Sequence, residues 1–541
     1  MCSFGPSQAD CRGSMAGGVA FFQYGFIFTN LGLPDVRDDL AGRLLNFSRQ
    51  ARIQIPMNTR QFYIDGAWVN PLAGTELDVI NPSNETVCAT ISLGGEADTQ
   101  AAVEAARRAF DSWSESSKSQ RLELMNRILE VYVSRSGEIA EAISQEMGAP
   151  VDMAASSQVG TGSYHIKAFI RALEAFEFER ELRPNTPNDR ILYQPIGVCG
   201  LITPWNWPMN QIALKVMPAL ASGCTMVLKP SELSPLSAMV FADILHEAGV
   251  PAGVFNLLNG DGAGVGTALS GHRDVAMISF TGSSRAGIAI SKNAADGLKR
   301  VSLELGGKGA NIVFADAAAE AVRDGVARCF NNTGQSCNAP TRMLVERSRY
   351  DEAVAQAKEQ ADNTAVDLAE KHGSHIGPLV SQMQYDKVQA LIERGISDDG
   401  ARLVAGGLGK PEGLETGYFV RPTVFADCNN DMAIMREEIF GPVLSMMPFD
   451  TEEEAIAIAN DTDYGLTNYV QTGDAARANR LARRLRSGMV DMNGQARSSG
   501  APFGGFKHSG NGREGGVWGL EEFLEVKAVG GWSSEIPEDS H

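Results

Sequence analysis

The sequence lacks long apolar runs and an excess of basic residues. No segment approaches the ~20 consecutive apolar residues that a membrane-spanning helix requires, so we expect no such helix and no membrane partner. Lys and Arg together number 47 against 66 Asp and Glu, which gives a net charge of −19. Because this charge repels polyanions at long range, we also expect no nucleic-acid partner.

Paired cysteines and metal-binding motifs are missing as well. The eight cysteines form no CxxC pair and no dense framework, which favours free thiols in a reducing compartment, and we expect a cytoplasmic protein. There are seven histidines and no HExxH motif. His372 and His375 are three residues apart but have no further ligand nearby, so we predict no metal site.

A GxGxxG dinucleotide fingerprint is also absent. The glycine-rich stretch 259–266 looks similar, but Val265, Thr267 and Leu269 stand where further glycines would be needed. Gly262 lies at the start of a predicted helix, and a second glycine-containing turn spans 282–287. Backbone amides at either helix N-terminus could hold a pyrophosphate, although the signal is weak.

The 541 residues are too many for one compact core, so several domains are expected. Residues 1–56 differ in composition from the rest, and we interpret them as a poorly ordered extension or a misassigned translation start, with Met57 as the functional start. The short apolar run after Arg12 lacks a clear cleavage site, which argues against a secretory signal.

From Met57 onward the pattern predicts strands alternating with helices. A hairpin is expected around the Asp65-Gly66 turn, a helix from about Thr99 capped by Asp98, and a helix from Ser234. Predicted strands lie at 196–202, 224–229, 254–258, 275–280, 342–346, 418–420 and 443–446. This alternation indicates an α/β protein with two doubly wound parallel-sheet domains.

Ligands of such sheets bind beyond the carboxyl ends of the strands. Unusual segments follow three of the predicted strands: 203–208, 230–232 and 281–284. Each is also compatible with an ordinary turn. Because parallel strands end at the same edge, we expect the three segments to converge on one rim.

Two residues stand out as chemical candidates. Cys337 lies between small polar residues, after a Gly-Gln turn and before a predicted strand. Glu304 ends a strand and is followed by Gly306 and Gly307, which permit close approach of backbone or ligand. A carboxylate beside an apolar sheet should have a raised pKa and could act as a general base, whereas the structural alternative is a solvated glutamate on an edge strand. Cys329, on an apolar helical stripe, is interpreted as a buried structural thiol.

Eight motifs follow one another in order: PWNWP, LKPSE, FTGSSRAG, LELGGK, GQSC, REEIFGPV, NDTDYGL and PFGGFKHSGNGRE. From about Gln61 to Val529 the chain thereby resembles the NAD(P)-dependent aldehyde dehydrogenases. Within this family, the sequence around Cys337 is most similar to that of bacterial members that oxidise semialdehydes or bulky aldehydes. The resemblance implies an NAD-binding domain (57–175 and 195–304), oligomerisation strands (176–194 and 520–532), a catalytic domain (305–519) and a tail (533–541).

The resemblance also implies a mechanism. Cys337 would attack the aldehyde carbon as a thiolate, while the side-chain amide of Asn206 and the backbone N–H of Cys337 hold the oxyanion. Glu304 would then activate the water that hydrolyses the thioester, giving a carboxylic acid and reduced NAD.

The cofactor contacts implied by the resemblance follow the strand ends. Lys229 and Glu232 would contact the adenosine ribose, and the carboxylate of Glu232 favours NAD over NADP because it repels a 2′-phosphate. Gly282 and Ser283 would lie at the pyrophosphate, and Glu438 and Phe440 at the nicotinamide ribose and ring. The remaining implied contacts are Ile202, Trp205, Gly262, Phe280 and Leu305.

The implied substrate pocket combines Trp207, Asn210, Gln211 and Leu214 with the loop 494–503. Within that loop, Arg497 would either pair with a carboxylate at the far end of a semialdehyde or be solvated. Glu514 would serve either in proton exit or as a surface helix residue.

Several alternatives remain at this stage. A coenzyme-A-acylating relative would use the same cysteine but lacks the water-activating glutamate, so Glu304 argues against it. A cysteine hydrolase of another fold would need a histidine base, and no histidine lies in a recognisable motif. A non-catalytic scaffold member of the family would not need Cys337, Glu304 and Asn206 together. The oligomerisation strands that the resemblance implies, 176–194 and 520–532, would pair between subunits and imply a homodimer or homotetramer.

Overall fold

The computed structural model describes residues 58–72 and 74–533. These residues belong to one compact unit, which begins at Ile53. The expected extension 1–56, the expected start at Met57 and residues 534–541 of the tail lie outside the described residues. Within the described range no helix is both long and apolar enough to cross a membrane.

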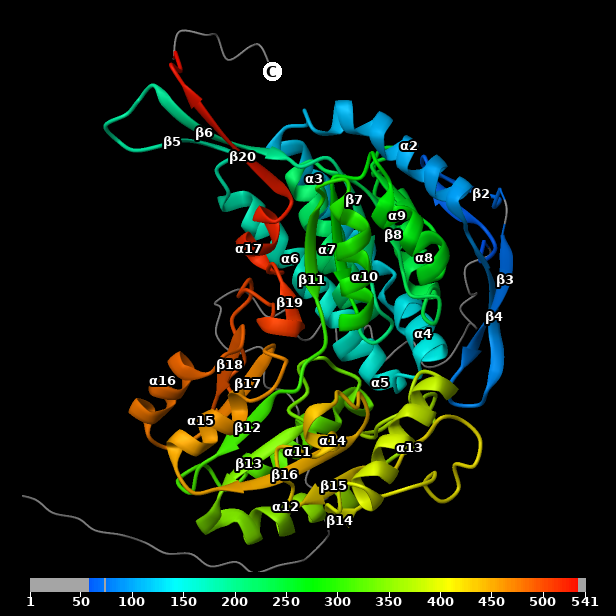
Figure 1. Ribbon diagram of the computed structural model, residues 1–541. Helices are drawn as coiled ribbons and strands as arrows, with labels where there is room; N and C mark the ends of the chain where they lie inside the picture. Colours follow the sequence, from blue (N-terminus) through cyan, green and yellow to red (C-terminus); the bar gives the residue numbers. More distant parts are fainter. Residues whose placement is uncertain (1–57, 73, 534–541) are drawn as a thin grey trace, which may run out of the picture. The chain divides into compact units, whose positions relative to one another are not determined.

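The first sheet has eight strands in the order β19-β11-β10-β7-β8-β9-β1-β2 (Figure 1). Its five central strands, β11 to β9, are parallel, and the predicted hairpin β1–β2 forms one antiparallel edge. The strands are β1 (Phe62–Ile64), β2 (Ala67–Val69), β7 (Val198–Ile202), β8 (Thr225–Lys229), β9 (Phe255–Leu257), β10 (Met277–Thr281), β11 (Arg300–Glu304) and β19 (Gly510–Asn511).

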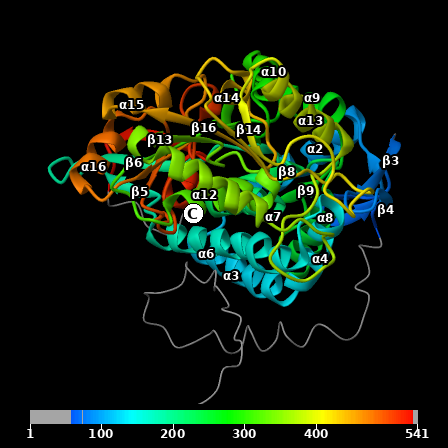
Figure 2. The same cartoon turned by 90° about the horizontal axis from the view of Figure 1, so that it is seen from below.

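Helices cover both faces of this sheet. On one face, side chains of α2, α9 and α10 join alternate strand residues such as Val198 and Ile202 in one apolar cluster. On the other face, Cys199 and Leu201 face a second cluster formed largely by α3, α4, α6, α7 and α8, and Figure 2 shows α3 beside α6. The helices are α2 (Glu96–Trp113), α3 (Lys118–Ser134), α4 (Ser136–Met147), α5 (Val151–Met153), α6 (Val159–Ala175), α7 (Pro208–Ser222), α8 (Leu236–Glu247), α9 (Thr267–Gly271), α10 (Ser284–Ala295) and α17 (Gly516–Glu521).

Three predicted helix starts differ from the structure. The helix expected from Thr99 begins at Glu96, and Asp98 acts from inside its first turn by accepting a hydrogen bond from the N–H of Gly95 at 3.0 Å. The helix expected from Ser234 begins at Leu236. The helix expected from about Ala263 begins as a π-helical turn, 262–266, before α9.

The second sheet has seven strands in the order β14-β15-β16-β13-β12-β17-β18, all parallel except β14. Figure 1 shows it below the first sheet, so the two parallel sheets of the predicted α/β class are confirmed. Its strands are β12 (Ala310–Val313), β13 (Arg342–Glu346), β14 (Arg402–Ala405), β15 (Thr423–Ala426), β16 (Val443–Phe449), β17 (Thr467–Gln471) and β18 (Met489–Met492). Its helices are α11 (Ala321–Phe330), α12 (Tyr350–Asp362), α13 (Gln382–Ser397), α14 (Ala433–Arg436), α15 (Glu452–Asn460) and α16 (Ala475–Arg484).

The prediction of a strand at 418–420 is wrong. These residues form a buried loop, in which the N–H of Tyr418 donates to the carbonyl of Pro82 at 3.0 Å and its carbonyl accepts from Leu379 at 3.0 Å. Their apolar character comes from burial against other loops, because the strand of the sheet begins only at Thr423.

The segments expected to mediate oligomerisation form a separate three-stranded sheet. β20 (Leu524–Gly530) pairs antiparallel with β6 (Asp189–Pro195), which pairs with β5 (Glu179–Glu181). In Figure 1 these strands extend away from the helices around them. A second small sheet pairs β3 (Thr75–Asn81) with β4 (Thr86–Leu93).

The chain crosses between the two large sheets directly after Glu304. Residues 305–309 connect β11 of the first sheet to β12 of the second, and β13, next to β12, is preceded by the segment that carries Cys337. This crossing brings the carboxyl edge of the first sheet to the segment before β13.

Candidate active site

A tight turn leads from α11 to Cys337. Asn332, Thr333 and Gly334 have φ values of 53°, 58° and 70°, so three successive residues adopt the left-handed conformation. For the β-branched Thr333 this conformation is a strained outlier of the kind that clusters at functional sites. A Cβ on Gly334 would lie 2.1 Å from the carbonyl oxygen of Gly441, so glycine is required there. Packing therefore imposes the path of the segment that carries the thiol.

Asn206 and its neighbour Trp207 hold this segment from the first sheet. The side-chain amide of Asn206 donates to the carbonyl of Gln335 at 2.9 Å, and the indole N–H of Trp207 donates to the hydroxyl of Ser336 at 2.8 Å. Asn206 is only 4% exposed. The structure thus brings Asn206 next to the two residues that precede Cys337.

The two glycines Gly306 and Gly307 lie against Glu438 and Cys337, respectively. A Cβ on Gly307 would be 2.3 Å from the carbonyl oxygen of Cys337, and a Cβ on Gly306 would be 2.4 Å from a carboxylate oxygen of Glu438. The N–H of Gly307 donates to the carboxylate of Glu438 at 2.8 Å. Both glycines therefore permit a close approach that any side chain would prevent.

Glu304 is buried, with 3% of its surface exposed, and neither carboxylate oxygen has a hydrogen-bond partner among the described residues. Burial first, and then the negative charge of Glu514, raises its pKa well above the usual range, against the opposing effect of Lys215. The solvated edge-strand alternative is wrong, because β19 pairs with β11 on its outer side through Gly510. A buried, unpartnered carboxylate with a raised pKa is suited to general-base chemistry.

The thiol of Cys337 is half-buried. Burial raises its pKa above the usual range of a cysteine, and the carboxylates of Glu304, Glu438 and Glu514 raise it further. The thiol is therefore protonated at neutral pH, and attack on a substrate requires a base that removes its proton.

A buried ion pair next to Glu304 was not predicted from the sequence. The ammonium of Lys215, which is fully buried in α7, contacts the carboxylate of Glu514 and donates to the hydroxyl of Thr281 at 2.7 Å. Glu514 is 5% exposed, so its interpretation as a surface helix residue is wrong. A single lysine inside the apolar helical run 212–217 was the only sequence signal of this arrangement.

Two of the residues expected to contact a cofactor, Lys229 and Glu232, lie at the carboxyl end of β8 in the first sheet. The buried ammonium of Lys229 donates to the carbonyl oxygens of Pro230 at 2.9 Å and Gly260 at 2.6 Å, and contacts the carboxylate of Glu232 at 3.3 Å. Burial lowers the pKa of Lys229.

Further along the same edge, Ser283 caps α10 by accepting from the N–H of Ala286 at 3.3 Å. The N–H groups of the first turn of α10 therefore lie beside Gly282 and Ser283, as an anion-binding helix terminus requires. Together with the carboxylate of Glu232 and the ammonium of Lys229, this donor set fits a dinucleotide, with hydroxyl groups at one end and a pyrophosphate beside α10.

The other expected cofactor residues differ in their surroundings. The rings of Trp205 and Phe440 meet edge to face with centroids 5.4 Å apart. Ile202, Phe280 and Leu305 are largely buried in the core beneath the edge. Gly262 faces open space and begins the π-helical turn that Asp261 caps.

Arg497 is held by an ion pair. Its guanidinium donates to the carboxylate of Asp491 at 3.0 Å, and Asp491, 2% exposed at its side chain, also pairs with Arg328 at 2.8 Å. The interpretation of Arg497 as a solvated residue is therefore wrong, whereas its pairing with a substrate carboxylate stays a prediction.

The remaining candidates are structural. Cys329 is fully buried, as expected. His372 pairs with Asp152 at 2.7 Å, and the second imidazole, of His375, contacts the carbonyl of Leu368 at 3.1 Å. Among residues 58–72 and 74–533 no group of three or more His, Cys, Asp or Glu side chains is placed to hold a metal ion.

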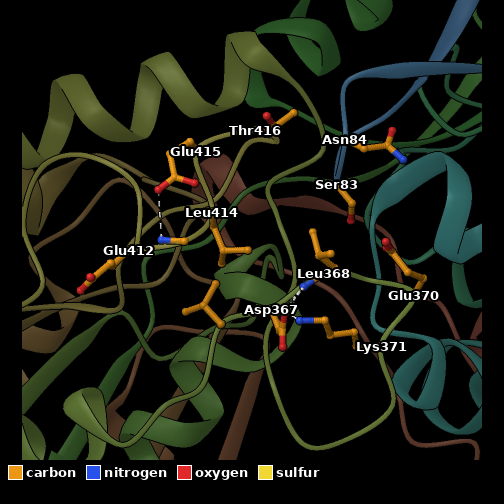
Figure 3. Close-up of a pocket in the computed structure, with 12 residues that line it drawn as sticks. Ser83, Asn84, Asp367, Leu368, Glu370, Lys371, Glu412, Leu414, Glu415 and Thr416 are labelled. Atoms are coloured by element: carbon orange, nitrogen blue, oxygen red, sulfur yellow. Dashed lines mark hydrogen bonds and ion pairs between the residues drawn. The ribbon is translucent and has the colours of Figure 1, made fainter.

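A charged surface pocket of about 460 Å³ lies elsewhere, between the β3–β4 turn and the loops 366–371 and 412–416. Figure 3 shows Lys371 directed at Asp367. The N–H of Gly413 donates to the carboxylate of Glu415 at 3.2 Å. Neither Cys337 nor Glu304 lines this pocket. It is not part of the candidate active site.

The fold and the site define a class of protein: an α/β enzyme of two parallel sheets, with a cysteine and a buried carboxylate at their junction and a strand edge that fits a dinucleotide. The model of the aldehyde dehydrogenase family matches residues 68–529. The chain belongs to the aldehyde dehydrogenase family.

Individual relatives agree with this. The chain is 54% identical over 475 residues to a 3-succinoylsemialdehyde-pyridine dehydrogenase from a Pseudomonas species, which covers 87% of this chain and 98% of the relative. A crystal structure of an aldehyde dehydrogenase from Bartonella henselae has a TM-score of 0.87 and 57% identity, covering 88% and 99% of the two chains. A mutant of aldehyde dehydrogenase C from Pseudomonas syringae, in complex with NAD+ and octanal, has a TM-score of 0.87 and 47% identity, covering 90% and 99%.

Proposed function

We propose that this enzyme oxidises an aldehyde to the carboxylic acid by covalent catalysis at Cys337. The observation that carries the proposal is the convergence of a thiol, an amide and a carboxylate from distant segments. Asn206 contacts the segment of Cys337, Gly307 lies against the carbonyl of Cys337, and Glu304 raises the pKa of the thiol.

In the first step Glu304 takes the proton of Cys337, directly or through a water molecule, and the sulfur attacks the aldehyde carbon. The C–S bond forms as the carbonyl π electrons move to oxygen. The side-chain amide of Asn206 uses one N–H on Gln335 and has a second for this oxyanion. The N–H of Cys337, which has no acceptor among the described residues, is the other donor. One such donor contributes about 3 kcal/mol to transition-state stabilisation.

In the second step the oxyanion collapses and the substrate carbon loses a hydride, which NAD bound at the strand edge would accept, and a thioester remains on Cys337. Glu304 first releases to solvent the proton that it took from Cys337, and then removes a proton from water. The resulting hydroxide attacks the thioester carbon, the C–S bond breaks to release the acid, and the leaving thiolate takes its proton back from Glu304. Overall, aldehyde, NAD+ and water give acid, NADH and a proton. The high pKa of Glu304 makes its carboxylate a strong base for this second step.

NAD is the proposed cofactor, with NADP less favoured. Glu232 presents a carboxylate 3.3 Å from the ammonium of Lys229 at the expected ribose position, where it would repel a 2′-phosphate. Relatives crystallised as NAD+ complexes support this proposal.

A bulky aldehyde or a semialdehyde is the proposed substrate class. The name of the Pseudomonas relative specifies a semialdehyde that carries a pyridine, and the P. syringae complex contains the eight-carbon aldehyde octanal. The coenzyme-A-acylating alternative is less favoured because Glu304 is present and buried beside the nucleophile.

The test is to follow the absorbance of the reduced cofactor when the purified protein meets NAD or NADP and a panel of aldehydes, with Cys337→Ala as the control. We expect reduction of NAD that disappears in the variant, and the free acid as product. A coenzyme-A thioester formed on addition of coenzyme A would favour the acylating alternative. No reduction with any aldehyde, in folded protein that binds NAD, would leave the scaffold alternative.

Assembly as a homodimer or homotetramer is proposed from the sheet β20-β6-β5. β20 is an edge strand with most side chains exposed, including Val526 at 63%, and such an edge invites pairing with another chain. Light scattering of the wild type and of Val526→Lys tests this, and a monomeric wild type would contradict it. The free thiols are consistent with the proposed cytoplasmic location.

A further inference from the structure

A polar pair lies where helices α6 and α7 meet. The ring nitrogen Nε2 of His165 on α6 lies 3.2 Å from the side-chain nitrogen of Asn210 on α7. Both residues are half-buried, so they contact other residues yet keep exposed surface. Asn210 is one helical turn, about 5 Å, beyond Trp207, whose indole contacts the residue before Cys337. One turn of α7 and the side chain of Trp207 thereby connect the pair with the segment that carries Cys337.

The two side chains have more hydrogen-bonding capacity than they use. The contact between them occupies Nε2 of His165 and a single group of the Asn210 amide, and neither side chain has a further hydrogen-bond partner among the described residues, although the ring of Tyr164 packs edge to face against His165. Burial lowers the pKa of His165 to about 4, so the imidazole is neutral at neutral pH and carries one N–H donor and one acceptor. In either orientation of the amide, the contact between them leaves at least one N–H donor unused.

The next residue on α7 repeats this excess. Gln211 is 5% exposed, and its buried side-chain carbonyl oxygen has no partner among the described residues. An unpaired buried polar atom costs free energy that an apolar side chain of the same size would avoid. Helix α7 therefore carries, at Asn210 and Gln211, polar side chains whose hydrogen-bonding capacity the described residues do not fill.

We propose that His165 and Asn210 determine substrate specificity by donating a hydrogen bond to an acceptor in the body of the aldehyde, such as a ketone oxygen or an aromatic ring nitrogen. The inference rests on the proposed function and deepens it. The preferred substrates are then aldehydes with an uncharged acceptor several bonds from the aldehyde carbon, because the pair presents a neutral imidazole and an amide and no charge. A purely apolar aldehyde of equal size leaves these donors unpaired, and the enzyme discriminates against it.

The test compares two aldehydes of equal size, 3-(pyridin-3-yl)propanal and 3-phenylpropanal, which differ by one ring nitrogen. We expect wild type to favour the pyridyl aldehyde in kcat/KM by about tenfold, and Asn210→Leu and His165→Phe to bring the ratio close to one. Lys167→Leu, an exposed residue of α6, is the matched control and keeps the wild-type ratio. If the ratio of kcat/KM for the pyridyl and phenyl aldehydes is the same in wild type and in both variants, the inference is overturned. If the wild type oxidises none of the aldehydes, the proposed function is overturned instead.

A second measurement needs no variant and decides the question should Asn210→Leu and His165→Phe fail to fold. The acids 3-(pyridin-3-yl)propanoate and 3-phenylpropanoate compete with substrate in the wild type. We expect the pyridyl acid to inhibit with the lower inhibition constant. Equal constants, or a preference for the phenyl acid, contradict a donor at this position.

Discussion

The side-chain amide of Asn206 donates a hydrogen bond to the main-chain carbonyl of Gln335 at 2.9 Å, although 129 residues separate them in the chain. Asn206 follows β7 of the first sheet, and Gln335 lies two residues before Cys337 and ahead of β13 in the second. The proposed oxyanion donor and the segment of the proposed nucleophile are therefore joined across the junction of the two sheets. Such a fixed placement is the preorganisation that electrostatic catalysis requires.

Replacement of this amide should affect the chemical step more than substrate binding. We expect Asn206→Ala to lower kcat by about 10²–10³ with a smaller change in KM, because the oxyanion forms only as the reaction proceeds. Steady-state kinetics measures the effect. Asn206→Asp, which keeps the shape and removes the donor, is the companion variant. A kcat within twofold of wild type in both would exclude the role.

The two neighbouring cysteines should behave differently. Cys337→Ala should abolish NADH formation and keep NAD binding, measured by fluorescence titration. Cys329→Ala removes a fully buried thiol eight residues earlier, so it should retain kcat and lose about 1 kcal/mol in the free energy of unfolding. If activity survives in Cys337→Ala and disappears in Cys329→Ala, the assignment of Cys337 as the nucleophile is wrong.

Glu304→Gln should separate the two halves of the reaction. The amide cannot take a proton from water, so turnover should fall by about 10²–10⁴. Rapid mixing should show a slowed release of one NADH per active site followed by a stall, because the variant lacks the base for the thiol of Cys337 and also the base for the hydrolysis that follows hydride transfer. A linear time course at the wild-type rate would show that another group activates the water.

Arg497→Ala should leave the ratio of semialdehyde to simple-aldehyde turnover unchanged. Its guanidinium is engaged by Asp491, a nearly fully buried carboxylate, so a substrate carboxylate would have to compete with Asp491 for it. Turnover of succinic semialdehyde and butanal, measured side by side, provides the ratio. A selective loss with the carboxylate-bearing aldehyde would show that substrate competes with Asp491 for the arginine.

The sequence predicted those parts of the fold and site that depend on local pattern. Alternating strands and helices indicated the parallel sheets, and the motifs around Cys337, Glu304 and Asn206 indicated the reacting groups. The burial of Glu304 was not predictable locally, because Gly510, more than two hundred residues later, covers its strand. The loop at 418–420 was misread as a strand because burial against loops produces the same apolar run as burial in a sheet.

The ion pair of Lys215 and Glu514 was missed for the same reason. The partners are 299 residues apart, and no local pattern links a lysine in an apolar helix to a carboxylate near the end of the chain. Fully buried charges are uncommon unless they are paired, so Lys215 within its apolar run was a signal that a partner existed, but not of its identity.

This ion pair predicts opposite pH shifts for two variants. Glu304 has a raised pKa, so its basic form becomes populated only as pH rises, and kcat should increase with pH through that pKa. The charge of Glu514 raises the pKa of Glu304 and that of Lys215 lowers it. Glu514→Gln should therefore move the rising limb of the kcat profile to lower pH, and Lys215→Met should move it to higher pH.

Glu521→Gln, an exposed residue of α17, is the matched control and should leave the limb in place. Lys215→Met leaves Glu514 buried without its cation, and we expect it to lose about 3–5 kcal/mol in the free energy of unfolding, measured by urea denaturation. Its pH profile is therefore recorded at a temperature where the variant remains folded. A shift of both profiles in the same direction would mean that the two residues act through the packing around Glu304, and not through the field of their charges.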